Sequence, residues 1–118
     1  MAESFRKFQV GPDVFGRNWD VEFLWIQNAI SIRHADTVDV KFRLTCGDET
    51  MEKVIALPHP DLLALAAEGR RDLTDAWCSR LAASHIKRMI ETGEDLEKTL
   101  VTVPRGDLDA HAAAVAAG

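Results

Sequence analysis

The chain has 118 residues, of which 47% are hydrophobic and 28% are charged, a balance typical of a globular domain and not of a disordered segment. This length fits one domain and is too short for two separately cored ones. The net charge of −5 argues against a dedicated nucleic-acid binder, because neutralising phosphates requires a surplus of Lys and Arg.

Cysteine usage and hydropathy bear on the compartment in which the protein works. The two cysteines, Cys46 and Cys78, form neither a CxxC motif, nor a disulfide framework, nor a zinc ligand set. The first residues are charged and lack the apolar core of a secretory signal, and no apolar run approaches membrane-spanning length. We therefore expect a soluble cytoplasmic protein without a membrane span.

Composition divides the chain into three stretches. Residues 1–19 are rich in aromatic side chains and are expected to form an N-terminal arm or an extra strand. Residues 20–104 carry the alternating and helical patterns of a single α+β domain. Residues 105–118 are rich in alanine and too poor in apolar bulk to pack independently, so frayed helix and disorder are both open for this tail.

The first strand signal, residues 21–26, is apolar on both faces. A regular strand would place Phe23 and Trp25 on one face and Leu24 and Ile26 on the other. Both faces then need cover, either from the aromatic N-terminal stretch or from a second subunit. These four side chains are the candidate partner interface, and they favour a homodimer.

A strand with one solvent-exposed face is predicted over residues 37–46, where apolar and polar side chains alternate strictly. Upstream, Ile30 and Ile32 continue an alternating pattern. A three-residue loop between the two stretches would pair Ile32 with Val38 and Ile30 with Val40, so that like faces meet.

A two-residue turn at 47–48 leads into a second extended stretch and predicts a hairpin. Its register places Arg43 opposite Glu52, a favourable pair on the solvent-exposed face. Lys53 falls opposite Phe42 on the apolar face, which suggests an edge strand, where lysine discourages further pairing. The other predicted pairs are Cys46 with Glu49, Leu44 with Met51, Val40 with Ile55 and Val38 with Leu57.

Two helices are predicted next. Pro60 suits the first helical position of a short helix that Gly69 ends. A longer helix is capped by Asp72 or Thr74 and ends at Gly93. Its apolar side chains recur at helical spacing, so we expect this wide face to cover the sheet. They are Leu73, Trp77, Cys78, Leu81, Ala82, His85, Ile86, Met89 and Ile90.

The β-branched stretch 99–103 ends at Pro104 and is open to two interpretations, a further strand or continued helix. The predicted fold is α+β: an antiparallel meander of three to four strands, packed on one face by two helices, with room for a further strand near the C-terminal end.

A ligand pocket between the sheet and the second helix is one candidate site. Its walls would be Trp25, Trp77, Cys78 and His85, which place one titratable imidazole inside an apolar wall. Cys78 and His85 lie about 10 Å apart along the helix axis, too far for direct proton transfer. A hydrogen-bonded core histidine is the alternative role for His85. We assign no catalytic residue and no cofactor.

Basic side chains in and around the second helix form another candidate site. Acidic neighbours dilute them and no glycine-rich phosphate loop accompanies them, so a solvated helix face is the alternative to phosphate or nucleic-acid contact. They are Arg70, Arg71, Arg80, Lys87 and Arg88.

A possible metal cluster near one predicted turn contains His34, Asp36 and Asp39. Aspartates at turns also bond to their own backbone, and the spacing matches no known ligand pattern. We predict no metal site.

The sequence therefore favours a small, soluble, non-catalytic interaction or regulatory module that associates as a homodimer. The alternative is a small-ligand-binding protein or enzyme with a pocket near His85. A protein partner other than a second copy stays open, and nucleic acid is not expected as a partner.

Overall fold

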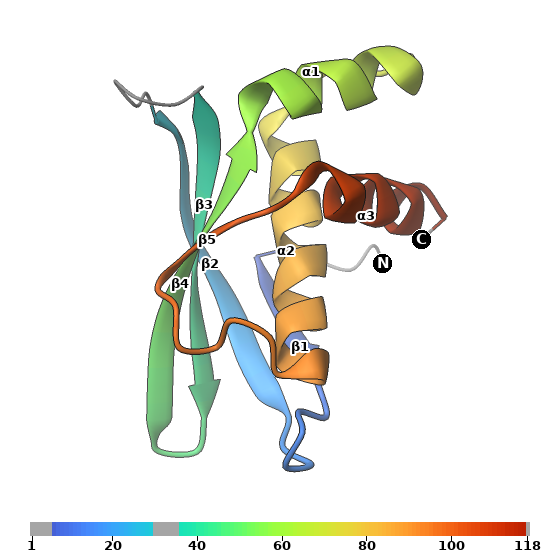
Figure 1. The fold of residues 1–118 in the computed structure, drawn as a ribbon. Helices are drawn as coiled ribbons and strands as arrows, with labels where there is room; N and C mark the ends of the chain where they lie inside the picture. Colours follow the sequence, from blue (N-terminus) through green and yellow to red (C-terminus); the bar gives the residue numbers. More distant parts are fainter. Residues whose placement is uncertain (1–5, 30–35, 118) are drawn as a thin grey trace.

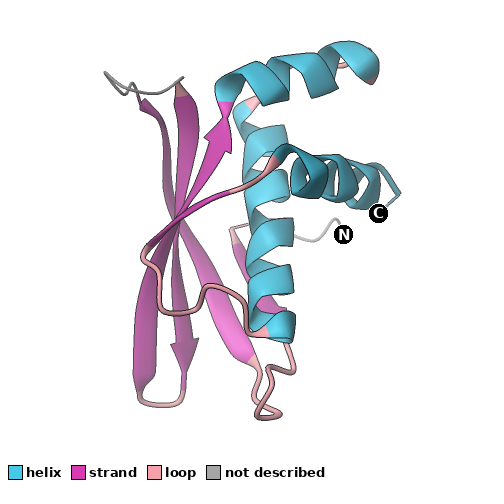
Figure 2. Ribbon diagram, in the orientation of Figure 1, coloured by secondary structure: helices cyan, strands magenta, loops and turns pink. Residues whose placement is uncertain are grey.

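The computed structural model describes residues 6–29 and 36–117 of the chain. The predicted α+β class is confirmed: helices cover one face of a largely antiparallel sheet (Figure 1, Figure 2). The sheet has five strands in the order β1-β2-β3-β4-β5. Their bounds are β1 Lys7–Val10, β2 Trp19–Ala29, β3 Thr37–Cys46, β4 Glu49–Pro58 and β5 Leu100–Thr102, and those of the helices are α1 His59–Glu68, α2 Asp75–Thr92 and α3 Arg105–Ala117.

Strands β1 to β4 form an antiparallel meander, and β5 returns after α1 and α2 to pair in parallel with β4. Part of the N-terminal stretch thus supplies an extra strand, β1, and the β-branched stretch near the C-terminal end supplies β5. Within the described ranges, no helix is long and apolar enough to cross a membrane.

The predicted β3–β4 register is confirmed throughout. Arg43 lies opposite Glu52, and Phe42 lies opposite Lys53. Gly47, the first turn residue, adopts φ +58°, a left-handed conformation that a tight hairpin turn requires and that glycine adopts without strain.

The predicted β2–β3 pairing is wrong. Val40 pairs with Ile26 instead of Ile30, and Val38 pairs with Asn28 instead of Ile32. The two registers differ by an even number of residues, so both bring the same faces together, and alternation cannot distinguish them. Ile30 and Ile32 themselves lie outside the described residues.

A β-bulge in β2 corrects the predicted faces of residues 21–26. The register pairs Phe23 with Phe42, Trp25 with Lys41 and Ile26 with Val40. Leu24 is therefore the extra residue, and the side-chain alternation changes phase after it. Phe23 and Ile26 both pack against the core, while Trp25 lies on the face away from the helices beside Lys41.

Lys53 belongs to an inner strand, which corrects the predicted edge position of β4. Its side chain is buried, and its Nζ donates hydrogen bonds to the carbonyl oxygens of Leu96 and Lys98. Burial lowers the pKa of Lys53. The two carbonyls replace water around the ammonium group and so offset the desolvation cost of its burial. The same two bonds hold the segment that leads into β5.

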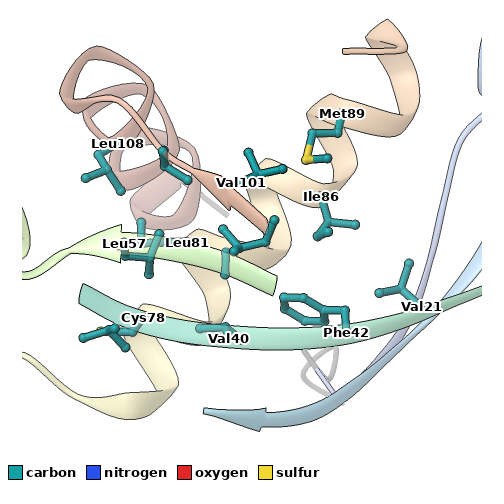
Figure 3. Close-up of a cluster of buried hydrophobic side chains, with 14 of the residues drawn as sticks. Val21, Val40, Phe42, Leu57, Cys78, Leu81, Ile86, Met89, Val101 and Leu108 are labelled. Atoms are coloured by element: carbon teal, nitrogen blue, oxygen red, sulfur yellow. The ribbon is translucent and has the colours of Figure 1, made fainter. Parts of the chain in front are cut away.

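The helix ends follow their sequence signals. Pro60 lies in the first turn of α1, and the Thr74 hydroxyl caps α2 by accepting from the Trp77 N–H at 3.1 Å. Gly93 ends α2 at φ +78°, and its N–H donates to the Met89 carbonyl. The apolar face of α2 packs on the sheet as predicted, and Ile86 and Met89 lie on the side of α2 that faces Phe42 of β3 (Figure 3).

The Ala-rich tail forms α3 and packs on α2. Leu108 and His111 are buried in that contact. Arg88 of α2 pairs with Asp107 at 2.7 Å, and Arg105 pairs with Glu68 of α1 at 2.8 Å. Two buried side chains and two ion pairs therefore hold α3 in place, although this helix has few large apolar side chains.

Candidate functional site

The loop that joins β1 to β2 is organised around one buried carboxylate. Asp13 accepts hydrogen bonds from the backbone N–H groups of Phe15 and Arg17, each at 2.9 Å, and from Nε of Arg17 at 3.1 Å. The indole Nε1 of Trp19 donates a fourth bond at 3.0 Å. The bond from Trp19, with those from Arg17 and Phe15, outweighs burial and lowers the pKa of Asp13 from 3.8 to about 2. The loop is thus held by an anion with several fixed donors.

The tip of this loop exposes two apolar side chains. Phe15 is 78% exposed and Val14 is 59% exposed. The guanidinium of Arg17 lies 5.5 Å from the ring centre of Phe15 and 5.2 Å from that of Trp19, so it braces the phenyl ring from one side. We call Val14 and Phe15 the loop tip.

The loop tip lies between two other segments of the chain. Arg17 Nη1 forms an ion pair with Glu49, just after the β3–β4 turn, at 2.9 Å. On the other side, a Cβ placed on Gly93 would lie 3.2 Å from a methyl carbon of Val14. The β1–β2 loop, the β3–β4 turn and the C-terminal end of α2 therefore meet at one end of the molecule (Figure 1).

A second polar cluster lies between α2 and α3. Nδ1 of His85 is 2.9 Å from Nε2 of His111, and Nδ1 of His111 is 2.8 Å from the hydroxyl of Ser84. Both imidazoles are buried. Burial lowers the pKa of His85, and burial together with the neighbouring His85 lowers that of His111 from 6.5 to about 4. Burial therefore favours the neutral form of both rings.

The chemistry available to this cluster is limited. An efficient general base has a pKa near the working pH, and His111 lies well below it. The thiol of Cys78 is not activated either, because burial raises its pKa to about 11. Ser84, His111 and His85 therefore act as a hydrogen-bonded connection between two helices.

The predicted pocket residues do not line a single wall. Trp77, Cys78 and His85 are buried side chains of α2, but Trp25 lies across the sheet from them. Arg71 stacks on Trp77, with its guanidinium 4.8 Å from the ring centre. Within the described ranges, neither Nε1 of Trp77 nor Nε2 of His85 has a hydrogen-bond partner.

The predicted partner interface is also divided by the bulge. Phe23 and Ile26 are partly buried against the core, and Trp25 is 36% exposed on the outer face, with Leu24 intermediate in burial. The four side chains therefore form no common surface, and the apolar excess that favoured a homodimer through this strand is largely accounted for within one chain.

The predicted basic concentration is only partly available to a ligand. Arg88 is engaged by Asp107, and Arg71 lies on Trp77. Arg70, Arg80 and Lys87 are exposed. Of the residues considered for a metal, His34 lies outside the described ranges, and within them no three His, Cys, Asp or Glu side chains converge on a metal position.

Sequence reasoning missed the residues that organise both clusters. Asp13 lies between Pro12 and Gly16, two residues typical of loops, but this pattern does not by itself indicate a buried acid. His111 lies three residues after Leu108, a helical spacing that marks the one face of the tail with larger side chains.

No protein-family profile, curated protein or solved structure matches the chain.

Proposed function

We propose that the chain is a small, non-catalytic interaction module that engages a protein partner through the loop tip. One observation carries this proposal: Phe15 leaves 78% of its surface exposed on a loop that a buried carboxylate holds in place. The bonds that hold the loop run through Asp13 and Arg17, so the phenyl ring is not needed for them.

A fixed loop lowers the cost of binding through Phe15. Ordering a flexible side chain in an interface costs about 0.5–1.5 kcal/mol, and ordering a loop adds to that cost. The hydrogen bonds to Asp13 order this backbone in the free protein, so less freedom is lost on association. Exposed aromatic side chains that pack into a partner are also the usual centres of binding energy.

The polar groups of the interior support a non-catalytic role. His111 is a weak base, and Cys78 is held as a thiol. Cys46 and Cys78 are both free, in keeping with the cytoplasmic location that we propose.

The homodimer that the sequence favours is the competing form of this proposal, in which the partner is a second copy. Light scattering of the wild-type chain and of a Phe15→Ser variant over a range of concentrations tests this form. A dimer mass that Phe15→Ser reduces to the monomer mass supports it, and a monomer mass at every concentration contradicts it.

A small-ligand protein is the second candidate, and one observation favours it: Nε2 of His85 is buried without a hydrogen-bond partner within the described residues. A thermal-shift screen with a fragment library compares the wild type with His85→Gln. Fragments that stabilise only the wild type support a ligand role for His85. No stabilising fragment, or equal stabilisation of both chains, argues against it.

Selection from a random peptide library displayed on phage tests the loop-tip proposal. We expect peptides enriched on the wild type to bind Phe15→Ser at least about ten times more weakly, because the aromatic anchor is lost. Leu63→Ser is the matched control, since Leu63 is an exposed apolar side chain on α1. Peptides that bind all three chains equally, or an absence of enrichment, contradict the proposal.

A further inference from the structure

The surroundings of the loop tip are acidic. Asp48 lies in the β3–β4 turn, beside the Glu49 that binds Arg17. Glu91 and Glu94 flank Gly93, against which Val14 lies. All three carboxylate side chains, Asp48, Glu91 and Glu94, are exposed, and none forms an ion pair within residues 6–29 and 36–117.

Nearby cations cancel this charge only in part, since the one exposed cation beside it without an ion pair in the described ranges is Lys87, one helical turn before Glu91. Arg17 is the basic side chain of the loop itself, and it is shared between Asp13 and Glu49. Lys98 pairs with Asp95. The C-terminal end of α2 points toward the same end of the molecule, and the helix dipole adds partial negative charge there.

We propose, building on the function proposed above, that the partner presents a cationic segment with an apolar anchor. The anchor is a large apolar side chain that packs on Phe15 and Val14. Flanking Lys or Arg side chains of the partner then lie near Asp48, Glu91 and Glu94, where the charges are complementary.

The same charges disfavour other occupants of this end. A twofold contact between two copies would bring the same patch to itself, and so would place acidic groups against acidic groups. Nucleic acids and anionic membrane surfaces are repelled for the same reason. A cationic protein segment with an apolar side chain can both pack on the loop tip and pair with the surrounding carboxylates.

Three synthetic peptides of one length test the partner chemistry. They share the same leucine positions and carry Lys, Gln or Glu elsewhere. We expect the Leu–Lys peptide to bind the full chain, and to bind more weakly as the salt concentration is raised. Its affinity for the Phe15→Ser variant should be at least about ten times lower than for the wild type. The Leu–Gln and Leu–Glu peptides should bind far more weakly.

Charge variants at the two ends of α2 supply a matched comparison. The double variant Glu91→Gln/Glu94→Gln should lower the affinity for the Leu–Lys peptide roughly 3- to 10-fold, because two exposed charge pairs are lost. Asp72→Asn with Asp75→Asn removes the same charge near the other end of the helix and should leave the affinity unchanged. Equal weakening by both pairs shows a general charge effect and overturns the inference.

The two proposals fail in different ways. If library peptides depend on Phe15 but are neutral or acidic, the cationic partner is overturned and the interaction module stands. If the Leu–Lys peptide binds Phe15→Ser as well as it binds the wild type, the loop tip is not the anchor and the inference is overturned. If library peptides are also indifferent to Phe15, the proposed function is overturned with it.

Discussion

Nδ1 of His85 lies 2.9 Å from Nε2 of His111, and this contact joins α2 to α3 inside the protein. One nitrogen of the pair donates its proton and the other accepts, so the bond requires that the accepting ring be neutral. Arg88 and Asp107, which pair at 2.7 Å, act electrostatically on both rings, and Asp95 and Glu94 act on His85 as well. The attachment of the tail helix is therefore sensitive to protonation.

Acidification should destabilise the protein through this pair. Both folded-state pKa values are lowered from 6.5, so the unfolded chain binds more protons below pH 6.5. Stability is expected to fall as the pH drops from about 7 toward 4, by on the order of 1–3 kcal/mol, and these two groups contribute almost no slope above about pH 8. Urea unfolding at a series of pH values measures the slope.

A His85→Leu/His111→Leu double variant is the control for that experiment. Its stability should vary less between pH 7 and 5 than that of the wild type, because carboxylates common to both chains supply the remaining slope. An identical slope in both chains would show that the histidines are not responsible.

The Asp13 network predicts a large effect from a single loop residue. Asp13→Ala removes the acceptor for the buried indole N–H of Trp19 and for the N–H groups of Phe15 and Arg17, so the urea midpoint should fall and the loop amides should exchange faster with solvent. Asp20→Asn, an exposed change on β2, should leave both nearly unaltered. Unchanged exchange of the loop amides in Asp13→Ala would refute the bracing role.

Replacing Lys53 should loosen the segment before β5. Lys53→Met leaves the carbonyls of Leu96 and Lys98 without their donor, which should cost about 1–3 kcal/mol of unfolding free energy. Hydrogen exchange should rise in residues 94–100. Lys41→Met, on the outer face of the sheet, should cost less than about 1 kcal/mol. Equal costs at the two lysines would argue against the carbonyl contacts.

The bulge at Leu24 predicts unequal costs for two neighbouring aromatic residues. Phe23 packs edge-on against Phe42 with ring centres 6.1 Å apart, while Trp25 lies on the outer face. Phe23→Ala should cost about 2–4 kcal/mol and Trp25→Ala less than about 1 kcal/mol. Urea unfolding compares them, and a larger cost at Trp25 would contradict the observed faces.

Local patterns predicted the parts of the fold that depend on local chemistry. The β3–β4 register followed from a tight turn after a strictly alternating strand. The end of α2 followed from Gly93, and its start was narrowed to Asp72 or Thr74, of which Thr74 is the cap. The β2–β3 register was not predictable, because shifting a strand by an even number of residues keeps the same side chains on each face of the sheet. The bulge was hidden as well, since one extra residue changes the phase without leaving a composition signal.

The candidate site was harder to predict than the fold. Asp13 and His111 are ordinary polar residues in the sequence, and their roles arise from partners brought close by the fold, such as Trp19 and His85. Lys53 shows the same limit: alternation placed it correctly on the apolar face, but its carbonyl partners come from residues more than forty positions later.

The most direct test of the loop-tip interface is an amide chemical-shift map of the wild-type chain titrated with the Leu–Lys peptide. We predict that the largest shifts fall in three segments, residues 11–18, 47–49 and 90–95, and that Phe15→Ser abolishes them. Shifts that centre on the other end of the molecule, around residues 70–80, or that persist in Phe15→Ser, would contradict the proposed interface.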